Sequence, residues 1–117
     1  DIQPQDQYRN YTLVSAEQFS DRDVYVINIT NEQDPEAKIL TVWIDRERFI
    51  PLKEEYRVTE GEKETVKTTL YKNPWQLKDG RWMPLRIEKY ENGKMTCYII
   101  LKETSINDGL DEDLFIP

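Results

Sequence analysis

The chain of 117 residues is 38% hydrophobic and 33% charged, and its 23 acidic against 16 basic residues give a formal net charge of −7. This length and composition predict one folded domain, residues 1–117, and the negative charge opposes the basic surface that nucleic-acid binding requires. No apolar run approaches the ~20 residues of a transmembrane helix, and the absence of histidine removes imidazole from metal and acid–base chemistry. We therefore expect no catalytic residue, no metal site and no cofactor.

Strand-like segments follow one another along almost the whole chain. They are rich in β-branched and aromatic residues, and turn residues separate them. Asn92-Gly93 is the strongest turn signal, because both residues tolerate the positive φ of a tight hairpin turn. We expect hairpins in sequence and one short helical turn at 108–115, capped by Asp108 or Asp111. The predicted strands are 11–16, 23–30, 39–45, 51–59, 64–71, 84–91 and 94–103.

The predicted strands have one apolar face and one charged face. In the fourth strand, Leu52 and Tyr56 alternate with Lys53 and Arg57, and successive side chains of a strand point to opposite faces. Later segments repeat this alternation, so we expect an all-β protein built on a twisted antiparallel sheet. The residues expected on its covered face are Ile44, Leu52, Tyr56, Leu70, Ile87, Ile99 and Leu101, and those expected on its wet face are Lys53, Arg57, Lys67 and Glu88.

Three polar features have structural interpretations. Cys97 follows the apolar alternation, so it is expected to be a buried and inert thiol. The charged run 45–48 is interpreted as a β-turn, with a partner-docking loop as the alternative. The acidic run 111–113 lacks the spacing and the glycine of a calcium loop, so no metal is assigned to it.

The apolar face needs a cover that the predicted elements do not supply. In small proteins such a face packs against a helix or a second sheet. The sheet could instead curl into a half-barrel, pair with a second copy of the chain, or pack on helices outside this sequence. Two unpaired sheet edges and an exposed apolar face favour self-association, so a homodimer is one expectation.

Three motifs resemble the outer-membrane lipoprotein-sorting (LolA-like) protein family, in its C-terminal part. The first runs from Val42 to Arg46, with Pro51-Leu52-Lys53 after it, and the second is 79–84, which reads Asp-Gly-Arg-Trp-Met-Pro. The third closes the chain, from Leu110 to Phe115. The resemblance covers nearly the whole chain, and its motifs are structural rather than catalytic. It implies an incomplete, strongly curved antiparallel β-barrel whose concave apolar face, closed by helices, holds acyl chains.

The resemblance implies a carrier or sensor without enzymatic activity. Its partner would be a lipoprotein or lipid acyl chain, and its location would be extracytoplasmic, either periplasmic or attached to the cell envelope. The apolar face listed above would bind the ligand, flanked by Trp43, Tyr56 and Tyr98. For each aromatic residue, ordinary cross-strand packing is the alternative to ligand contact.

A second functional interpretation is a protein-interaction module. The helix and first strands of the family's N-terminal portion have no counterpart in this sequence. The chain is therefore expected to be a C-terminal fragment of a longer protein, or a short relative that completes its barrel by dimerising. In this interpretation a second copy or missing helices cover the apolar face, and no lipid binds.

Overall fold

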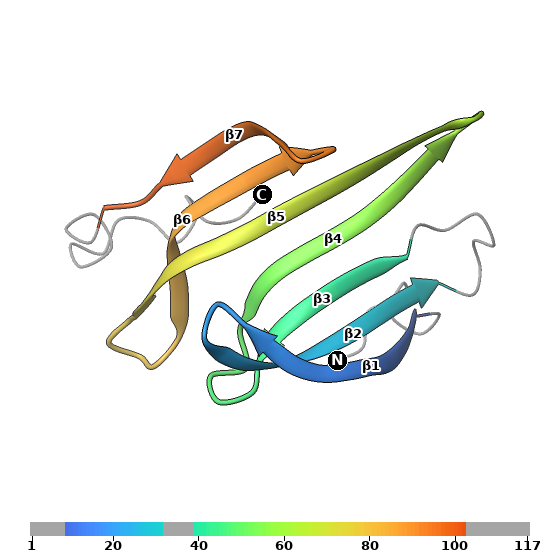
Figure 1. The fold of residues 1–117 in the computed structure, drawn as a ribbon. Coiled ribbons are helices and arrows are strands. Elements are labelled where there is room, and N and C mark those ends of the chain that lie inside the picture. The colour runs from blue at the N-terminus through green and yellow to red at the C-terminus, as the bar shows by residue number, and fades with distance from the viewer. Residues whose placement is uncertain (1–8, 32–38, 103–117) are drawn as a thin grey trace.

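The computed structural model describes residues 9–31 and 39–102, and these residues form one seven-stranded sheet. Neighbouring strands are consecutive in sequence and antiparallel, so the sheet is a meander (Figure 1). The described ranges contain no helix, and therefore none long and apolar enough to cross a membrane. The strands are β1 (Arg9–Phe19), β2 (Arg22–Asn31), β3 (Leu40–Asp45), β4 (Pro51–Glu60), β5 (Lys63–Gln76), β6 (Trp82–Glu91) and β7 (Lys94–Ile100).

The predicted strands and most predicted turns are confirmed. Asn92 and Gly93 both have positive φ, 50° and 83°, as the tight turn between β6 and β7 requires. Ser20 and Asp21 form an equivalent two-residue turn between β1 and β2, with φ of 51° and 61°. The predicted helical turn at 108–115 lies outside the described residues.

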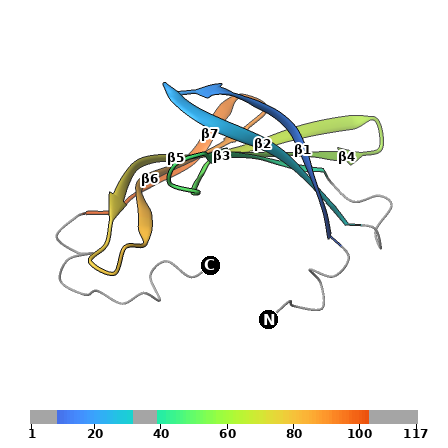
Figure 2. The same ribbon diagram turned by 90° about the horizontal axis from the view of Figure 1, so that it is seen from below.

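The sheet curves into an open trough. Figure 2 shows a hollow side toward which the β3–β4 loop and the far end of the β5–β6 hairpin bend. The register shifts between Leu13 and Ser15, between Trp43 and Ile44, and between Lys89 and Tyr90. Such bulges increase the local twist and bend of a sheet, so they contribute to this curvature. We call the hollow side the concave face and the other side the convex face.

The buried core is small for a sheet of this size. Val24, Val26 and Leu52 form a cluster, against which Phe19 and Trp43 pack. In the part of the chain that the structure describes, the only other buried hydrophobic residue is Val42. Most apolar side chains are therefore half-buried or exposed, as in a single-layer sheet without a second layer.

The face predicted for β5 is wrong, because the hairpin turn at residues 61 and 62 sets another register. This turn places Glu60 opposite Lys63, so that Tyr56 meets Lys67 and Lys53 meets Leu70. Lys67 therefore shares a face with Tyr56, and Leu70 lies on the opposite face with Lys53. The expected positions of Leu70 and Lys67 are wrong, because the alternation within a strand does not reveal which of its faces matches that of its partner.

Two expectations about exposure are also wrong. Glu88 shares a face with Lys53, as expected, but it is only 4% exposed because Lys72 and Arg86 cover its carboxylate. Cys97 is exposed rather than buried. It lies on β7, which pairs only with β6 among the described strands, so no neighbouring strand covers its other side.

Candidate functional site

A cleft of about 590 Å³ lies on the concave face, between the β3–β4 loop and the β5–β6 hairpin end. This volume lies within the roughly 300–1,000 Å³ that is typical of small-molecule sites. Most of its lining is apolar. The lining residues are Ile50, Pro51, Leu52, Glu54, Thr69, Tyr71, Pro74, Trp82, Met83, Pro84, Ile87, Lys89, Ile99 and Leu101.

A kink in β5 makes one wall of the cleft. Asn73 has a φ of 53°, the left-handed conformation that asparagine tolerates better than most residues. The next residue, Pro74, pairs with Pro84 of β6, and proline offers no N–H to a neighbouring strand. This kinked end of the hairpin bends toward the hollow side in Figure 2, so that Trp82 and Met83 lie beside the trough.

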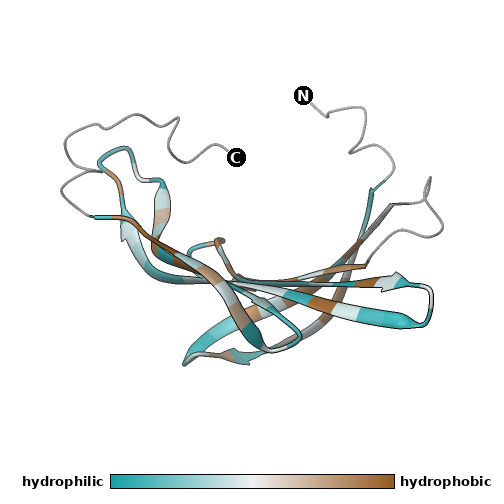
Figure 3. Cartoon of the chain, turned by 90° about the horizontal axis from the view of Figure 1, so that it is seen from above, coloured by the Kyte–Doolittle hydropathy of each residue, from teal (hydrophilic) through white to brown (hydrophobic). Residues whose placement is uncertain are grey.

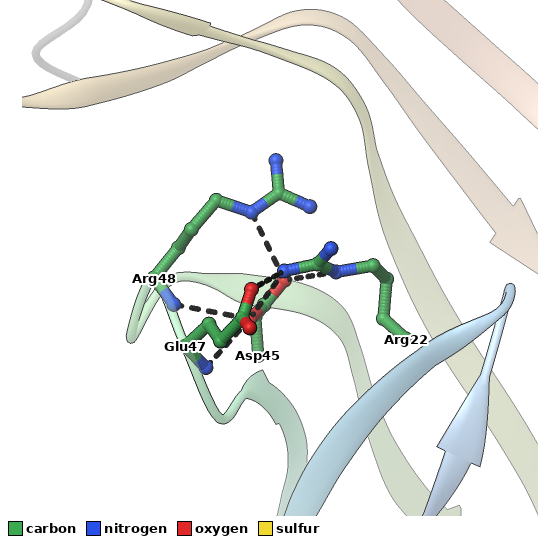
Figure 4. A network of polar contacts seen from close by, with 4 residues as sticks. All are labelled: Arg22, Asp45, Glu47 and Arg48. Carbon is green, nitrogen blue, oxygen red and sulfur yellow. Dashed lines mark hydrogen bonds and ion pairs between the residues drawn. The ribbon is translucent and has the colours of Figure 1, made fainter.

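The β3–β4 loop makes the opposite wall, and Asp45 holds it in place (Figure 4). The Oδ1 atom of Asp45 accepts the backbone N–H groups of Glu47 at 2.8 Å and Arg48 at 3.0 Å. Its Oδ2 atom accepts hydrogen bonds from Nε of Arg22 at 2.9 Å and from Nε of Arg48 at 3.1 Å. The carboxylate is fully buried, and these four bonds compensate its loss of hydration.

The bonds to Asp45 also lower its pKa. Burial alone would raise the pKa, because it disfavours the charged form. The hydrogen bonds from Arg22 and from the backbone of Arg48 and Glu47 outweigh burial and hold the pKa well below its ordinary value of 3.8. Asp45 is therefore a charged loop anchor. The run 45–48 does form a turn, but the backbone N–H of Phe49 closes it on the Asp45 carbonyl at 2.9 Å, so it is one residue longer than the expected β-turn.

A polar row crosses the floor of the cleft. Glu54 of β4 pairs with Thr69 of β5, and Thr69 pairs with Lys89 of β6. Tyr71 lies two residues after Thr69 on β5 and therefore on the same face of the sheet. Burial raises the pKa of Tyr71 to about 12, and the charge of Glu54 and its hydrogen bond with the phenol act in the same direction. The phenol therefore stays protonated and donates to Glu54 at neutral pH.

The structure brings together four of the predicted ligand-binding residues. Leu52, Ile87, Ile99 and Leu101 line the cleft. Ile44 and Tyr56 belong to the concave face by register, but they do not line the cleft.

The other three predicted residues lie on the convex face. Leu70 pairs with Lys53. Trp43 also pairs with Lys53, whose ammonium is 4.4 Å from a Trp43 ring centre. Tyr98 lies against Arg86, with 4.7 Å between the guanidinium carbon and the ring centre. In the described part of the chain, the two aromatic residues thus contact cations of neighbouring strands, which matches the packing alternative.

Several cleft residues were not predicted as site residues. The motif 79–84, which was interpreted as structural, contains Trp82, Met83 and Pro84. Pro74 likewise lies beside a tryptophan, Trp75. Two prolines near aromatic residues were the available signal, Pro74 after the predicted strand 64–71 and Pro84 at the start of the predicted strand 84–91, since proline in a strand marks an edge or a bulge. Tyr71 and Lys89 gave no signal, because their faces depend on register.

Comparisons with known proteins agree with the architecture. A family model described as "Uncharacterized protein" matches residues 1–117, and a search of curated proteins found no match. A candidate outer membrane lipoprotein-sorting protein domain from Vibrio parahaemolyticus superposes with a TM-score of 0.61 at 20% identity, over 89% of this chain and 48% of that one. A LolA superfamily protein from Nitrosomonas europaea gives a TM-score of 0.56 at 22% identity, over 94% and 50%.

The chain thus spans about half the length of these two solved structures. At such identities the likeness shows the fold, and the expected fold class, a curved antiparallel sheet of the LolA-like type, is confirmed. The chain belongs to the family of uncharacterized proteins whose model matches it from residue 1 to residue 117, and its sheet has a LolA-like fold.

Proposed function

We propose that the concave face binds the acyl chain of a lipoprotein or another lipid without covalent chemistry, as a carrier or sensor outside the cytoplasm. The observation that carries this proposal is the cleft, where ten of fourteen lining residues are apolar and two loops bend toward the hollow side of the sheet. The fold shared with a candidate lipoprotein-sorting domain supports the same ligand class and an extracytoplasmic location.

Burial of methylene groups supplies enough free energy for such binding. Each buried CH₂ is worth about 0.8 kcal/mol, so ~8 carbons give roughly 6 kcal/mol before the costs of immobilising the chain. No charged contact is needed for this part of the affinity. A protein with a net charge of −7 can therefore hold a lipid tail.

The polar groups of the cleft favour binding over catalysis. Tyr71 donates to Glu54, and Lys89 stands beyond Thr69 in the polar row. None of these groups pairs a nucleophile with a base in the manner of an acyl-transfer site. This supports a protein that binds its ligand and releases it unchanged.

Adjacent residues of β7 provide a matched test. Ile99 lines the cleft, and Ile100 points to the opposite face and is 58% exposed. Ile99→Asp should reduce saturable uptake of a fluorescent fatty acid at least tenfold, because it places a charge beside the acyl chain. Ile100→Asp should leave uptake within about twofold of the unsubstituted protein, because its new charge faces water.

Two control measurements accompany this test. Circular dichroism should show the same β spectrum for both variants. Sedimentation of the unsubstituted protein reports whether it forms a dimer. A clean dimer that takes up no acyl probe would replace the carrier proposal by the interaction module, and equal uptake by the two variants would also overturn it.

A further inference from the structure

We propose that the ligand of the concave face is an amphiphile with an anionic head group, a carboxylate or a phosphate, and that Lys89 binds this head group. The inference rests on the proposed function, because it assigns the polar end of a molecule whose acyl chain occupies the same cleft. It narrows the ligand class from the acyl chains of lipoproteins and other lipids to lipids whose head group carries a negative charge.

The polar and apolar residues of the cleft are segregated. Glu54, Thr69 and Lys89 lie side by side across three strands, and Tyr71 is the only other polar residue of the lining. The walls are apolar. The residues at the tip of the β4–β5 hairpin are hydrophilic, as the teal ribbon in Figure 3 shows. A ligand that satisfies both ends of this gradient has an apolar tail and a polar head.

Register fixes the direction in which such a ligand would lie. Ile87 and Ile99 pair with each other across β6 and β7, and Lys89 and Cys97 form the pair two residues closer to the β6–β7 turn. The tail therefore lies over Ile87 and toward the wall at Met83 and Pro84. The head lies at Lys89, and the Thr69 hydroxyl is placed to donate a second hydrogen bond.

Lys89 supplies the one cation among the described lining residues of the cleft. Lys89 forms no ion pair within the described residues, and its cross-strand neighbours are uncharged, Thr69 on one side and Cys97 on the other. Glu54, the one carboxylate of the lining, is separated from Lys89 by Thr69 across the row. An exposed lysine that lines an apolar cleft, in a chain with more acidic than basic residues, provides a point charge for an anion.

The experiment compares head groups on one tail. Isothermal titration calorimetry below the critical micelle concentration would measure dodecanoate, dodecyl phosphate, methyl dodecanoate and dodecylamine. At least one of the two anions should bind about tenfold more tightly than the neutral ester, as expected for a charge-assisted contact at a partly open site. The tighter anion identifies the head group. Dodecylamine should bind no better than the ester.

Matched variants assign the effect to one residue. Lys89→Gln should bring the anions down to the affinity of the ester and leave the ester unchanged. Lys67→Gln removes the same charge from the same face, where Lys67 lies against the Tyr56 ring outside the cleft, and it should preserve the preference for anions. Circular dichroism spectra of both variants should match the unsubstituted protein.

The outcomes separate this inference from the proposed function. If the ester binds saturably but the anions bind no more tightly, or if Lys89→Gln keeps the preference, the head-group inference fails and the acyl cleft stands. Tighter binding of dodecylamine would also overturn it and would point to Glu54. If no probe binds, including the ester, the proposed function itself fails.

Discussion

Arg48 lies against Trp82, with 5.2 Å between its guanidinium carbon and the centre of the Trp82 ring. Through its Nε atom the same side chain donates to the buried Asp45 carboxylate. One residue thus joins the β3–β4 loop to the β5–β6 hairpin end, the two walls of the cleft. A cation–π contact and an ion pair of one side chain therefore link these two walls.

Arg48→Ala should weaken acyl binding because it disconnects the two walls. A cation–π contact of this kind is worth about 0.5–1 kcal/mol, so we expect a loss of roughly two- to fivefold in affinity for a fluorescent fatty acid. Arg46→Ala is the matched control, since Arg46 is exposed and lies over Tyr25, outside the cleft. An equal loss in both variants would show that the contact with Trp82 does not shape the cleft.

Asp45→Asn should destabilise the protein at neutral pH. Asparagine still accepts the backbone N–H groups of Glu47 and Arg48, but Arg22 and Arg48 lose a buried charged partner. We expect a loss of about 1–3 kcal/mol in the free energy of unfolding, measured by urea denaturation at pH 7. Asp23→Asn, at an exposed carboxylate nearby, should change it by no more than about 0.5 kcal/mol.

The same carboxylate predicts a stability loss in acid. Its folded-state pKa lies below the ordinary 3.8, so its contribution is fully present above that value and is lost as the pH falls through the folded-state pKa. The unsubstituted protein should lose stability below about pH 4, and Asp45→Asn should lose less over the same window. Parallel pH profiles of the two proteins would show that Asp45 does not carry this dependence.

The strands and their turns follow from local patterns, which explains why they were predictable. Alternation and turn chemistry act between near neighbours, and the Asn92-Gly93 turn is the clearest example. The Ser20-Asp21 turn is less visible, because serine is not typical at positive φ. The face of β5 was not predictable from its own residues. It is fixed by the register that the turn at 61 and 62 sets, and a shift of one residue exchanges the two faces.

The burial of Asp45 could not be predicted from its surroundings in the sequence. It stands in a run of four charged residues, a pattern typical of an exposed turn. Its partner Arg22 lies 23 residues earlier and reaches it because β2 and β3 are neighbours. The cleft was only partly predictable for the same reason, since residues that look like strand ends in sequence form a wall once Asn73 kinks the hairpin.

Substitutions at Asn92 should separate two contributions of this residue to stability, its tolerance of positive φ and its side-chain hydrogen bond. Asn92 tolerates a φ of 50°, and its Oδ1 atom accepts the backbone N–H of Val66 at 2.9 Å. Asn92→Gly keeps the turn conformation and loses only the side-chain bond, at a cost of about 0.5–1.5 kcal/mol in the free energy of unfolding. Asn92→Ala adds the strain of a left-handed non-glycine residue, about 1–2 kcal/mol more. Urea denaturation midpoints should fall in that order, and a more stable alanine variant would contradict this account.

Glu88 should titrate well below an ordinary glutamate. Hydrogen bonds from Lys72, Arg86 and Tyr90 lower its pKa from 4.5 to about 2, although it lies on the convex face that was expected to be wet. The charged form is therefore the stabilised one. Its contribution to stability is present above pH 4.5 and is lost as the pH falls through about 2. Side-chain carboxyl NMR shifts, followed as a function of pH, measure this pKa directly.

A charge-removing variant tests which contact lowers the pKa of Glu88. Lys72 makes the first contribution through a bond of 2.8 Å between its Nζ atom and Oε1 of Glu88. Lys72→Met should therefore raise the NMR pKa of Glu88 toward 4.5, and Lys78→Met, at an exposed position in the β5–β6 loop, should leave it unchanged. A pKa near 4.5 in the unsubstituted protein, or an equal response to both variants, would show that the cluster of cations on β5 and β6 does not hold this carboxylate in its charged form.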